Sequence, residues 1–151
     1  MKYHLLTLVL ILSMLCTTSC DNGSTKENLE HAAFAIEQNK YQAAKDICDD
    51  IQESQSHDET KDAVTLCNLS LLYMKLSENH DREDNIGLAR QCYLDAYATD
   101  SAQARDFYDH VEVEDLPHLL LLSSIVKSTT GSHANSFEEY IDEVDSISGL
   151  N

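Results

Sequence analysis

Residues 58–77 read DETKDAVTLCNLSLLYMKLS, and this stretch decides how the rest of the chain is organised. Its apolar residues recur at helical spacing but occupy more than one stripe of the helix: Ala63, Leu66, Leu69, Leu72, Tyr73 and Leu76. A helix that is apolar around most of its circumference is buried on most of its sides. The sequence therefore predicts a central helix over 58–77 that other helices must cover.

The flanking sequence supplies the helices that cover it. Apolar residues three and four positions apart indicate one buried face per helix, and they recur within 29–36, 41–51, 86–96, 104–111, 119–126 and 137–147. Because 119–122 are all leucines, we expect that helix to be central as well. No segment alternates like a strand, and the chain has only 4 Gly and 1 Pro. We expect an all-α fold of about six to seven helices that pair as antiparallel hairpins.

Helix start signals support these divisions. A capping box places a Ser, Thr or Asp three residues before a Glu or Gln, and the two side chains bond to N–H groups of the first turn. The chain has these pairs: Ser24 with Glu27, Ser56 with Glu59, Asp100 with Gln103, and Ser136 with Glu139. Pro117 suits a first helical turn, and Gly131 suits the position after a helix end.

The first twenty residues follow a different pattern. Lys2 is positively charged, 5–15 are largely apolar, 17–19 are small and polar, and Cys20 follows. The apolar run of about eleven residues is too short to span a bilayer, which needs about 20. This order resembles a bacterial lipoprotein signal peptide, in which the peptidase cuts before a cysteine that carries diacylglycerol. The resemblance implies a signal peptide over 1–19, a lipidated tether over 20–24 and a helical domain over 25–151.

The leader leaves alternatives open. Thr17 stands where the lipoprotein box usually has Leu, so a plain secretory signal or an uncleaved anchor is the alternative. Cleavage before Cys16 is less favourable because bulky Leu15 precedes it. Lipidation implies the bacterial cell envelope, with the outer membrane favoured over the inner one in a Gram-negative cell. Asp21 resembles the inner-membrane retention signal of some of these bacteria, so the sequence leaves the membrane and its face open.

The charge of the chain excludes one class of partner. With 27 acidic and 10 basic residues, the net charge is −17. Nucleic-acid binding needs clustered Lys and Arg that neutralise phosphates, so we expect none. Binding to anionic lipid is disfavoured for the same reason, and the acyl chains on Cys20 would provide the membrane attachment. An acidic surface can attract a cationic partner, although solvated helix faces explain the charge equally well.

Part of the helical region resembles the tetratricopeptide repeat. Residues 69–73, Leu-Ser-Leu-Leu-Tyr, match the L-G-x2-Y core of the repeat's first helix, and Ala89, Tyr93 and Ala96 match its second helix. A weaker match covers Ala32, Ala35, Tyr41, Ala44 and Cys48. The alternative is a compact bundle without repeat ancestry, because Ala44 and Ala89 lie farther apart than the repeat's period of about 34 residues. In the repeat interpretation, residues 78–85 form an insertion that lengthens one turn.

The resemblance, which covers about 26–100, also implies a binding surface. In such helical repeats the concave face binds peptides or proteins, and the first helix of each pair lines it. The candidate groove consists of Glu37, Leu71, Met74 and Lys75. A protein or peptide is therefore the expected partner.

The three cysteines beyond Cys20 fall on apolar helical stripes. Free cysteine behaves as a small hydrophobe in such positions, so we expect Cys48, Cys67 and Cys92 to be buried thiols. An exported compartment permits disulfides, and a Cys48–Cys67 bridge is the alternative.

No motif in the sequence assigns a catalytic, cofactor or metal site. The chain has no Cys and His residues at the spacing of a zinc site and no G-x-S-x-G motif, which positions the nucleophilic serine of many hydrolases. Two stretches concentrate acids and imidazoles. Residues 109–115 with His118 could bind a divalent ion if the corner between the helices over 104–111 and 119–126 folded back, and 80–84 is a second such stretch in a loop. Solvated helix ends are the simpler interpretation. We therefore expect a helical interaction module without catalysis. The alternatives are an acidic inhibitor or immunity lipoprotein that binds a cationic enzyme or toxin, or a small envelope enzyme.

Overall fold

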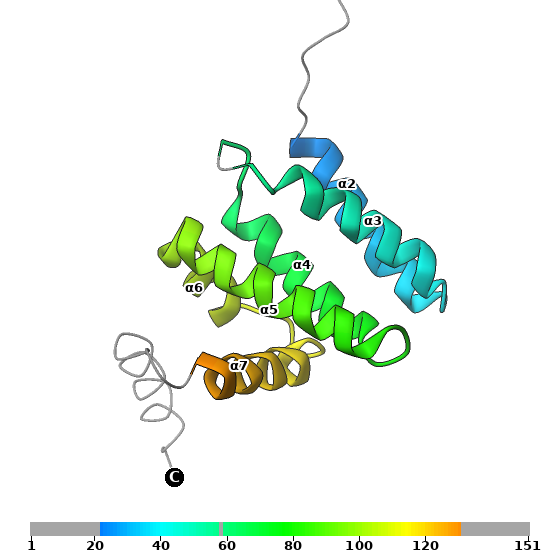
Figure 1. Cartoon of the computed structure of the whole chain (residues 1–151). Helices are drawn as coiled ribbons and strands as arrows, with labels where there is room; N and C mark the ends of the chain where they lie inside the picture. The colour runs from blue at the N-terminus through cyan, green and yellow to red at the C-terminus, as the bar shows by residue number, and fades with distance from the viewer. Residues whose placement is uncertain (1–21, 58, 131–151) are drawn as a thin grey trace, which may run out of the picture.

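The structure, a computed structural model, describes residues 22–57 and 59–130. This part of the chain contains six α-helices and no strand, which confirms the all-α prediction (Figure 1). The helices are α2 (Asn22–Glu37), α3 (Tyr41–Ser54), α4 (Ala63–Leu76), α5 (Arg82–Thr99), α6 (Ser101–Asp109) and α7 (Leu116–Thr130). The helix predicted over 137–147 lies outside the described residues, as do Cys20, Gly131 and the Ser136–Glu139 pair.

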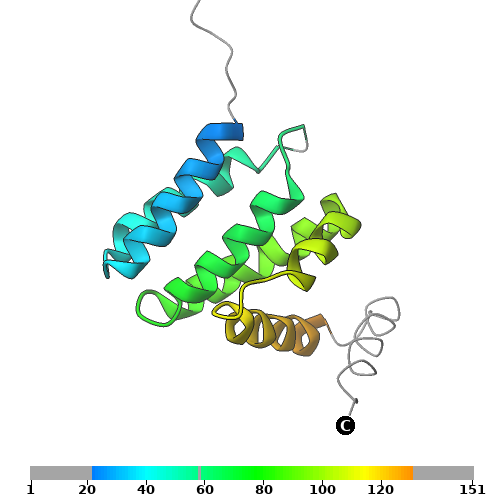
Figure 2. The same cartoon turned by 180° about the vertical axis from the view of Figure 1, so that it is seen from behind.

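Helix α4 is the centre of the molecule, as its sequence predicts. Eleven of its 14 residues are buried, and the helix contacts each of the other five. Figures 1 and 2 show α2 and α3 on one side of the α4–α5 pair, with α6 and α7 on the other. A helix surrounded in this way loses its solvent-facing stripe, which is why its apolar residues are spread around the circumference.

The helices pair as antiparallel hairpins. Helix α3 returns beside α2, and α5 returns beside α4, the pair with the most extensive contact (Figure 1). Fully buried alanines lie where the paired helices approach: Ala32 in α2, Ala44 in α3, and Ala89 and Ala96 in α5. Short side chains let the axes of paired helices approach to the lower end of the usual range of interaxial distances.

Two of the four predicted capping boxes are wrong. Helix α4 begins at Ala63 because the carboxylate of Asp62, and not Ser56, accepts a hydrogen bond from the backbone N–H of Thr65, at 2.8 Å. The side chain of Gln55 fixes this start by accepting from the N–H of Asp62 at 2.7 Å. Helix α2 begins at Asn22, so Ser24 lies within the helix and does not mark its start.

Two other start signals are confirmed. Asp100 caps α6, since its Oδ1 accepts from the backbone N–H groups of Ala102 and Gln103, both at 3.0 Å. The amide of Gln103 donates to the same carboxylate at 2.8 Å, instead of reaching back to the backbone. Pro117 lies in the first turn of α7, as predicted.

The insertion predicted over 78–85 is only partly a turn. Helix α4 ends at Leu76 and α5 begins at Arg82, so residues 82–85 extend α5 by one turn. Asp81 takes a left-handed backbone conformation with φ of 35°, which reverses the chain. The buried side chain of Asn85 donates to the carbonyl of His80 at 2.7 Å and closes the turn.

Candidate functional site

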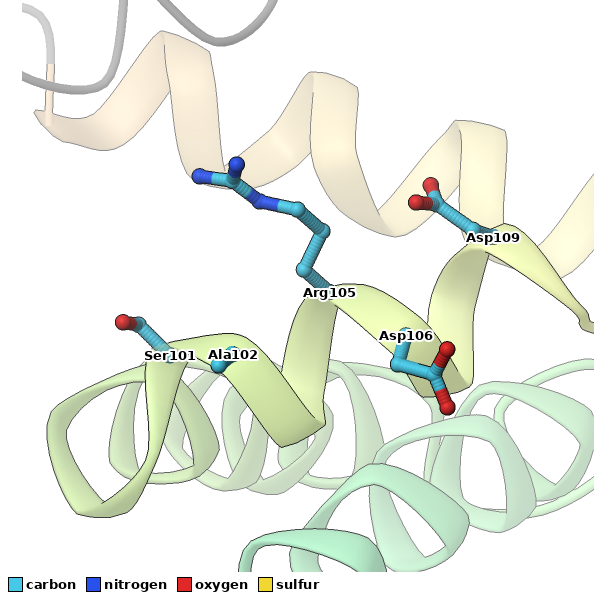
Figure 3. Close-up of a pocket in the computed structure, with 5 residues that line it drawn as sticks. All are labelled: Ser101, Ala102, Arg105, Asp106 and Asp109. Atoms are coloured by element: carbon cyan, nitrogen blue, oxygen red, sulfur yellow. The ribbon is translucent and has the colours of Figure 1, made fainter.

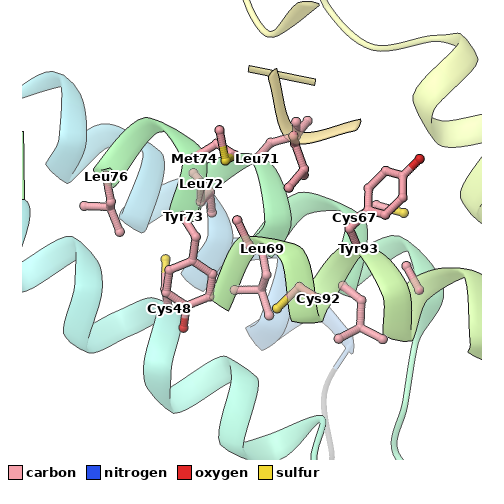
Figure 4. Close-up of a cluster of buried hydrophobic side chains, with 14 of the residues drawn as sticks. Cys48, Cys67, Leu69, Leu71, Leu72, Tyr73, Met74, Leu76, Cys92 and Tyr93 are labelled. Carbon is pink, nitrogen blue, oxygen red and sulfur yellow. The ribbon is translucent and has the colours of Figure 1, made fainter. Parts of the chain in front are cut away.

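The residues predicted to line a groove do not share an open surface. Leu71 and Met74 are buried in the core (Figure 4), because α4 is enclosed by its neighbours. The ammonium of Lys75 is partly covered and forms an ion pair with Asp115. Glu37, the last residue of α2, is exposed. Leu71 and Met74 therefore stabilise the fold and cannot contact a partner across a groove.

The structure brings part of the second charged stretch, Asp115 and His118, beside the end of α4, whereas no residue of 80–84 joins it. The residues Lys75, Glu78, Asp115 and His118 form what we call the charged corner, where the end of α4 meets the start of α7. Lys75 pairs with Asp115, and His118 Nε2 lies 3.1 Å from Glu78 Oε1. The ring of His118 is mostly buried, whereas Glu78 is exposed. An ion pair and a hydrogen bond thus tie the start of α7 to the end of α4.

The charged corner lacks the arrangement that a metal ion needs. Divalent cations bind several carboxylate or imidazole ligands at once. Within 22–57 and 59–130, no three His, Cys, Asp or Glu side chains are grouped so that they could hold an ion. At this corner the ammonium of Lys75 occupies the position beside Asp115 that a cation would need.

A second polar cluster joins α3, α4 and α5. Lys45 Nζ lies 2.9 Å from Asp49 on its own helix and 3.2 Å from Asp84 on α5. Burial opposes the charged form, but hydrogen bonds and attraction from Asp49 and Asp84 outweigh it and raise the pKa of Lys45. The hydroxyl of Tyr73 donates to Asp49 at 2.8 Å. Burial is the main cause that raises the pKa of Tyr73, and the carboxylate of Asp49 raises it further. The cluster fixes how the first helix pair sits on the second.

The three cysteines are buried free thiols, as predicted. Figure 4 shows Cys48, Cys67 and Cys92 among the side chains of the core. Burial is the main cause that raises their pKa values, to about 12 for Cys48, about 11 for Cys67 and about 12 for Cys92. A thiol with so high a pKa is neither a nucleophile nor a metal ligand at neutral pH. These side chains therefore act as small apolar residues.

A shallow pocket lies on the outer face of α6. Figure 3 shows the residues that line it: Ser101, Ala102, Arg105, Asp106 and Asp109. All of them belong to one helix and are exposed. Ligand sites usually bury most of a ligand between several elements. The described residues that line this pocket do not by themselves enclose a small molecule.

The surface feature that sequence reasoning missed is on α7. Leu116, Leu120 and Leu121, which we call the leucine strip, are 40%, 67% and 48% exposed. Val113, just before the helix, is exposed too, whereas Leu122 and Val126 face the core. The expectation that the leucine run 119–122 is central is therefore wrong for half of it. A signal was present, because Ser124 and Lys127 lie four and seven positions after Leu120 and mark the solvent face.

Comparisons with known proteins identify no relative of this chain. No protein-family model, curated protein or solved structure matches it. None of the helices in the described part of the chain combines the length and the apolar composition needed to cross a membrane.

Proposed function

We propose that this protein is anchored to the bacterial cell envelope by acyl chains on Cys20 and that its helical body binds a protein partner. The observation that carries the proposal is the order of the leader, a charged residue, an apolar run, small polar residues and then a cysteine. If Cys20 is the lipidated residue, only Asp21 separates it from the start of α2 at Asn22.

The physical chemistry of the anchor fits an acidic protein. Each buried methylene of an acyl chain contributes about 0.8 kcal/mol, so two or more chains hold a protein at a bilayer without help from charge. A net charge of −17 rules out attraction to anionic headgroups as the main force. The acyl chains would therefore supply the attachment, and the acidic faces would stay in water.

An anchor before α2 would orient the body. In both Figure 1 and Figure 2 the first turn of α2 lies at one end of the molecule and α7 lies at the other. The elements beyond α4 would then point away from the bilayer. This orientation supports a role in contacting another protein of the envelope, since the far end of the body is free of the membrane.

The helix pairs support a tetratricopeptide-like origin for the first half of the body. Helix α4 packs against both α2 and α3, as the first helix of a following repeat does, and buried alanines lie at the pair contacts. We infer a degenerate repeat pair over α2–α5 whose concave face is closed at α4. A partner would therefore bind the exposed faces and not a groove through Leu71 and Met74.

Metabolic labelling with an alkyne fatty acid tests the anchor. Cys20→Ala should abolish labelling, and Cys16→Ala is the matched control because it removes the neighbouring leader cysteine and should leave labelling intact. Fractionation should place the wild-type protein in membranes, and the Cys20→Ala variant should be released from them. Labelling that persists in Cys20→Ala would overturn the lipid anchor.

The charge favours a second candidate, an acidic inhibitor or immunity lipoprotein that neutralises a cationic enzyme or toxin. The excess of 27 acidic over 10 basic residues is the observation behind it. Charge-complementary complexes weaken steeply with salt, whereas apolar docking does not. Once a partner is captured by crosslinking in envelope membranes, its affinity at low and high ionic strength separates the two functions. Absence of any crosslinked partner would count against both.

A further inference from the structure

The leucine strip lies on the outward face of α7. This helix packs on α4 and α5, and both views show it at one edge of the body (Figures 1 and 2). Leu122 and Val126 fill its inward face, whereas the three leucines of the strip stay 40–67% exposed in the described part of the chain. Exposed apolar side chains that are contiguous, and not single, mark sites of interaction with other molecules.

The apolar surface extends beyond the three leucines. Val113, just before α7, is 78% exposed, and Pro117 is exposed between Leu116 and Leu121 around the helix. At about 1.5 Å per residue, Leu116 to Leu121 covers about 8 Å of the helix axis. The next residues of this face are polar, Ser124 and Lys127. The surface is therefore a short apolar area that ends within α7.

Carboxylates border this surface at the start of α7. Glu112 and Glu114 flank Val113 in the sequence, and both are exposed. The neighbouring carboxylate of Asp115 is paired with Lys75, whereas Glu112 and Glu114 form no ion pair with another described residue. No Lys or Arg occurs within 106–126. The leucine strip is thus apolar along the helix and negatively charged at one end.

We propose that the leucine strip binds a basic amphipathic helix of a partner protein, with apolar side chains on the strip and Lys or Arg beside Glu112 and Glu114. Helices recognised in this way present apolar anchors three or four positions apart, and the strip is long enough for two of them. A body of charge −17 attracts a cationic helix and repels an acidic one. The inference rests on the proposed function, because it names the site and the chemistry of the partner.

The same charges disfavour two other occupants. A second copy of the chain would bring together two bodies of charge −17, which repel each other. An anionic bilayer would repel Glu112 and Glu114, which flank the apolar side chains that would have to insert. A cationic protein segment meets neither obstacle.

Binding of a synthetic peptide to the full-length protein tests the proposal. The probe is a fluorescent peptide of about 14 Leu and Lys residues, about four helical turns, with Leu at helical spacing. The control peptide has Glu in place of each Lys. We expect the Leu–Lys peptide to bind, and Leu120→Ser with Leu121→Ser to weaken its affinity about tenfold. Glu112→Gln with Glu114→Gln should weaken it about threefold at low salt and have no effect at high salt.

Matched control variants lie on α2, which both views place away from α7 (Figures 1 and 2). Phe34→Ser removes an apolar side chain that is 57% exposed, and Glu27→Gln with Glu30→Gln removes two exposed carboxylates. These variants should bind the peptide as the wild-type protein does, and all variants should keep the helical circular dichroism. Absence of binding, equal binding of the Leu–Glu peptide, or equal weakening by the α2 variants would each overturn the proposal.

Thiol labelling shows whether the strip is open before a partner binds. The thiol of Leu120→Cys should react with a maleimide about as fast as that of Phe34→Cys, because the two positions are 67% and 57% exposed. A reaction about tenfold slower at position 120 would show that the chain itself or a second copy covers the strip, and it would overturn the proposal.

Crosslinking in envelope membranes separates this inference from the proposed function. A partner that crosslinks to the wild-type protein should be lost from Leu120→Ser with Leu121→Ser and retained by Phe34→Ser. If the strip variant keeps the partner, the proposed function stands and the leucine strip is not its site. The peptide assay does not require that partner, so the two proposals can fail separately.

Discussion

Replacing Leu69 by Ala probes the packing on which the whole fold depends. Leu69 is 0% exposed and lies in the middle of α4, the helix that all others contact. The substitution removes the equivalent of three methylene groups, which is about 2.4 kcal/mol of transfer free energy at about 0.8 kcal/mol each. A residual cavity adds about 1 kcal/mol, because the five helices packed around α4 cannot move far enough to fill the space. We expect the free energy of unfolding to fall by about 3–4 kcal/mol.

Urea titration followed by helical circular dichroism measures this loss. The midpoint should move to lower urea while the slope with denaturant stays constant, since the surface exposed on unfolding is unchanged. The control is Val64→Ala on the same helix, where the side chain is 38% exposed and the loss should stay below about 1 kcal/mol. If Leu69→Ala cost no more than Val64→Ala, α4 would not be the packed centre of the molecule.

Two further predictions concern a helix cap and the thiols. Hydrogen bonds from Gln103 and Ala102 lower the pKa of Asp100, so the cap stabilises the protein above the ordinary Asp pKa of about 3.9 and is lost as the pH falls through the folded pKa. The stability difference between the unmodified protein and Asp100→Ala, measured by urea titration, should therefore vanish in acid. A difference that persists there would contradict the role of the carboxylate. A thiol reagent at about pH 8 should leave Cys48, Cys67 and Cys92 unmodified in the folded protein and label them after denaturation. Labelling of the folded protein at the rate of free cysteine would contradict their burial.

Helix starts predicted from local sequence signals are confirmed where no better capping residue lies nearby. Asp100 and Pro117 both mark helix starts in the structure. The Ser56 signal failed because a better acceptor, Asp62, lies six residues later and is fixed in place by Gln55. A capping box describes what a first turn can use, and the chain uses the candidate whose backbone is held by the surrounding fold.

The candidate site shows the same division. Charge and motif content directed attention to 80–84 and 109–115, but contacts between helices decide that Lys75 pairs with Asp115 and that His118 meets Glu78. The Lys45–Asp49 pair is readable from its spacing within one helix, whereas its partner Asp84 comes from α5 and has no sequence signal. Pairs between distant segments depend on how the helices cross.

The order of apolar and polar residues was enough to identify the helices, the hairpins and the burial of α4, because helical periodicity is a local property of the chain. It was not enough to orient α7, since four consecutive leucines point in every direction around the helix axis. Only the packing of α7 against α4 and α5 turns Leu122 inward and leaves Leu120 in solvent. The same packing encloses Leu71 and Met74, so tertiary contacts decide which apolar residues build the core and which are available for binding.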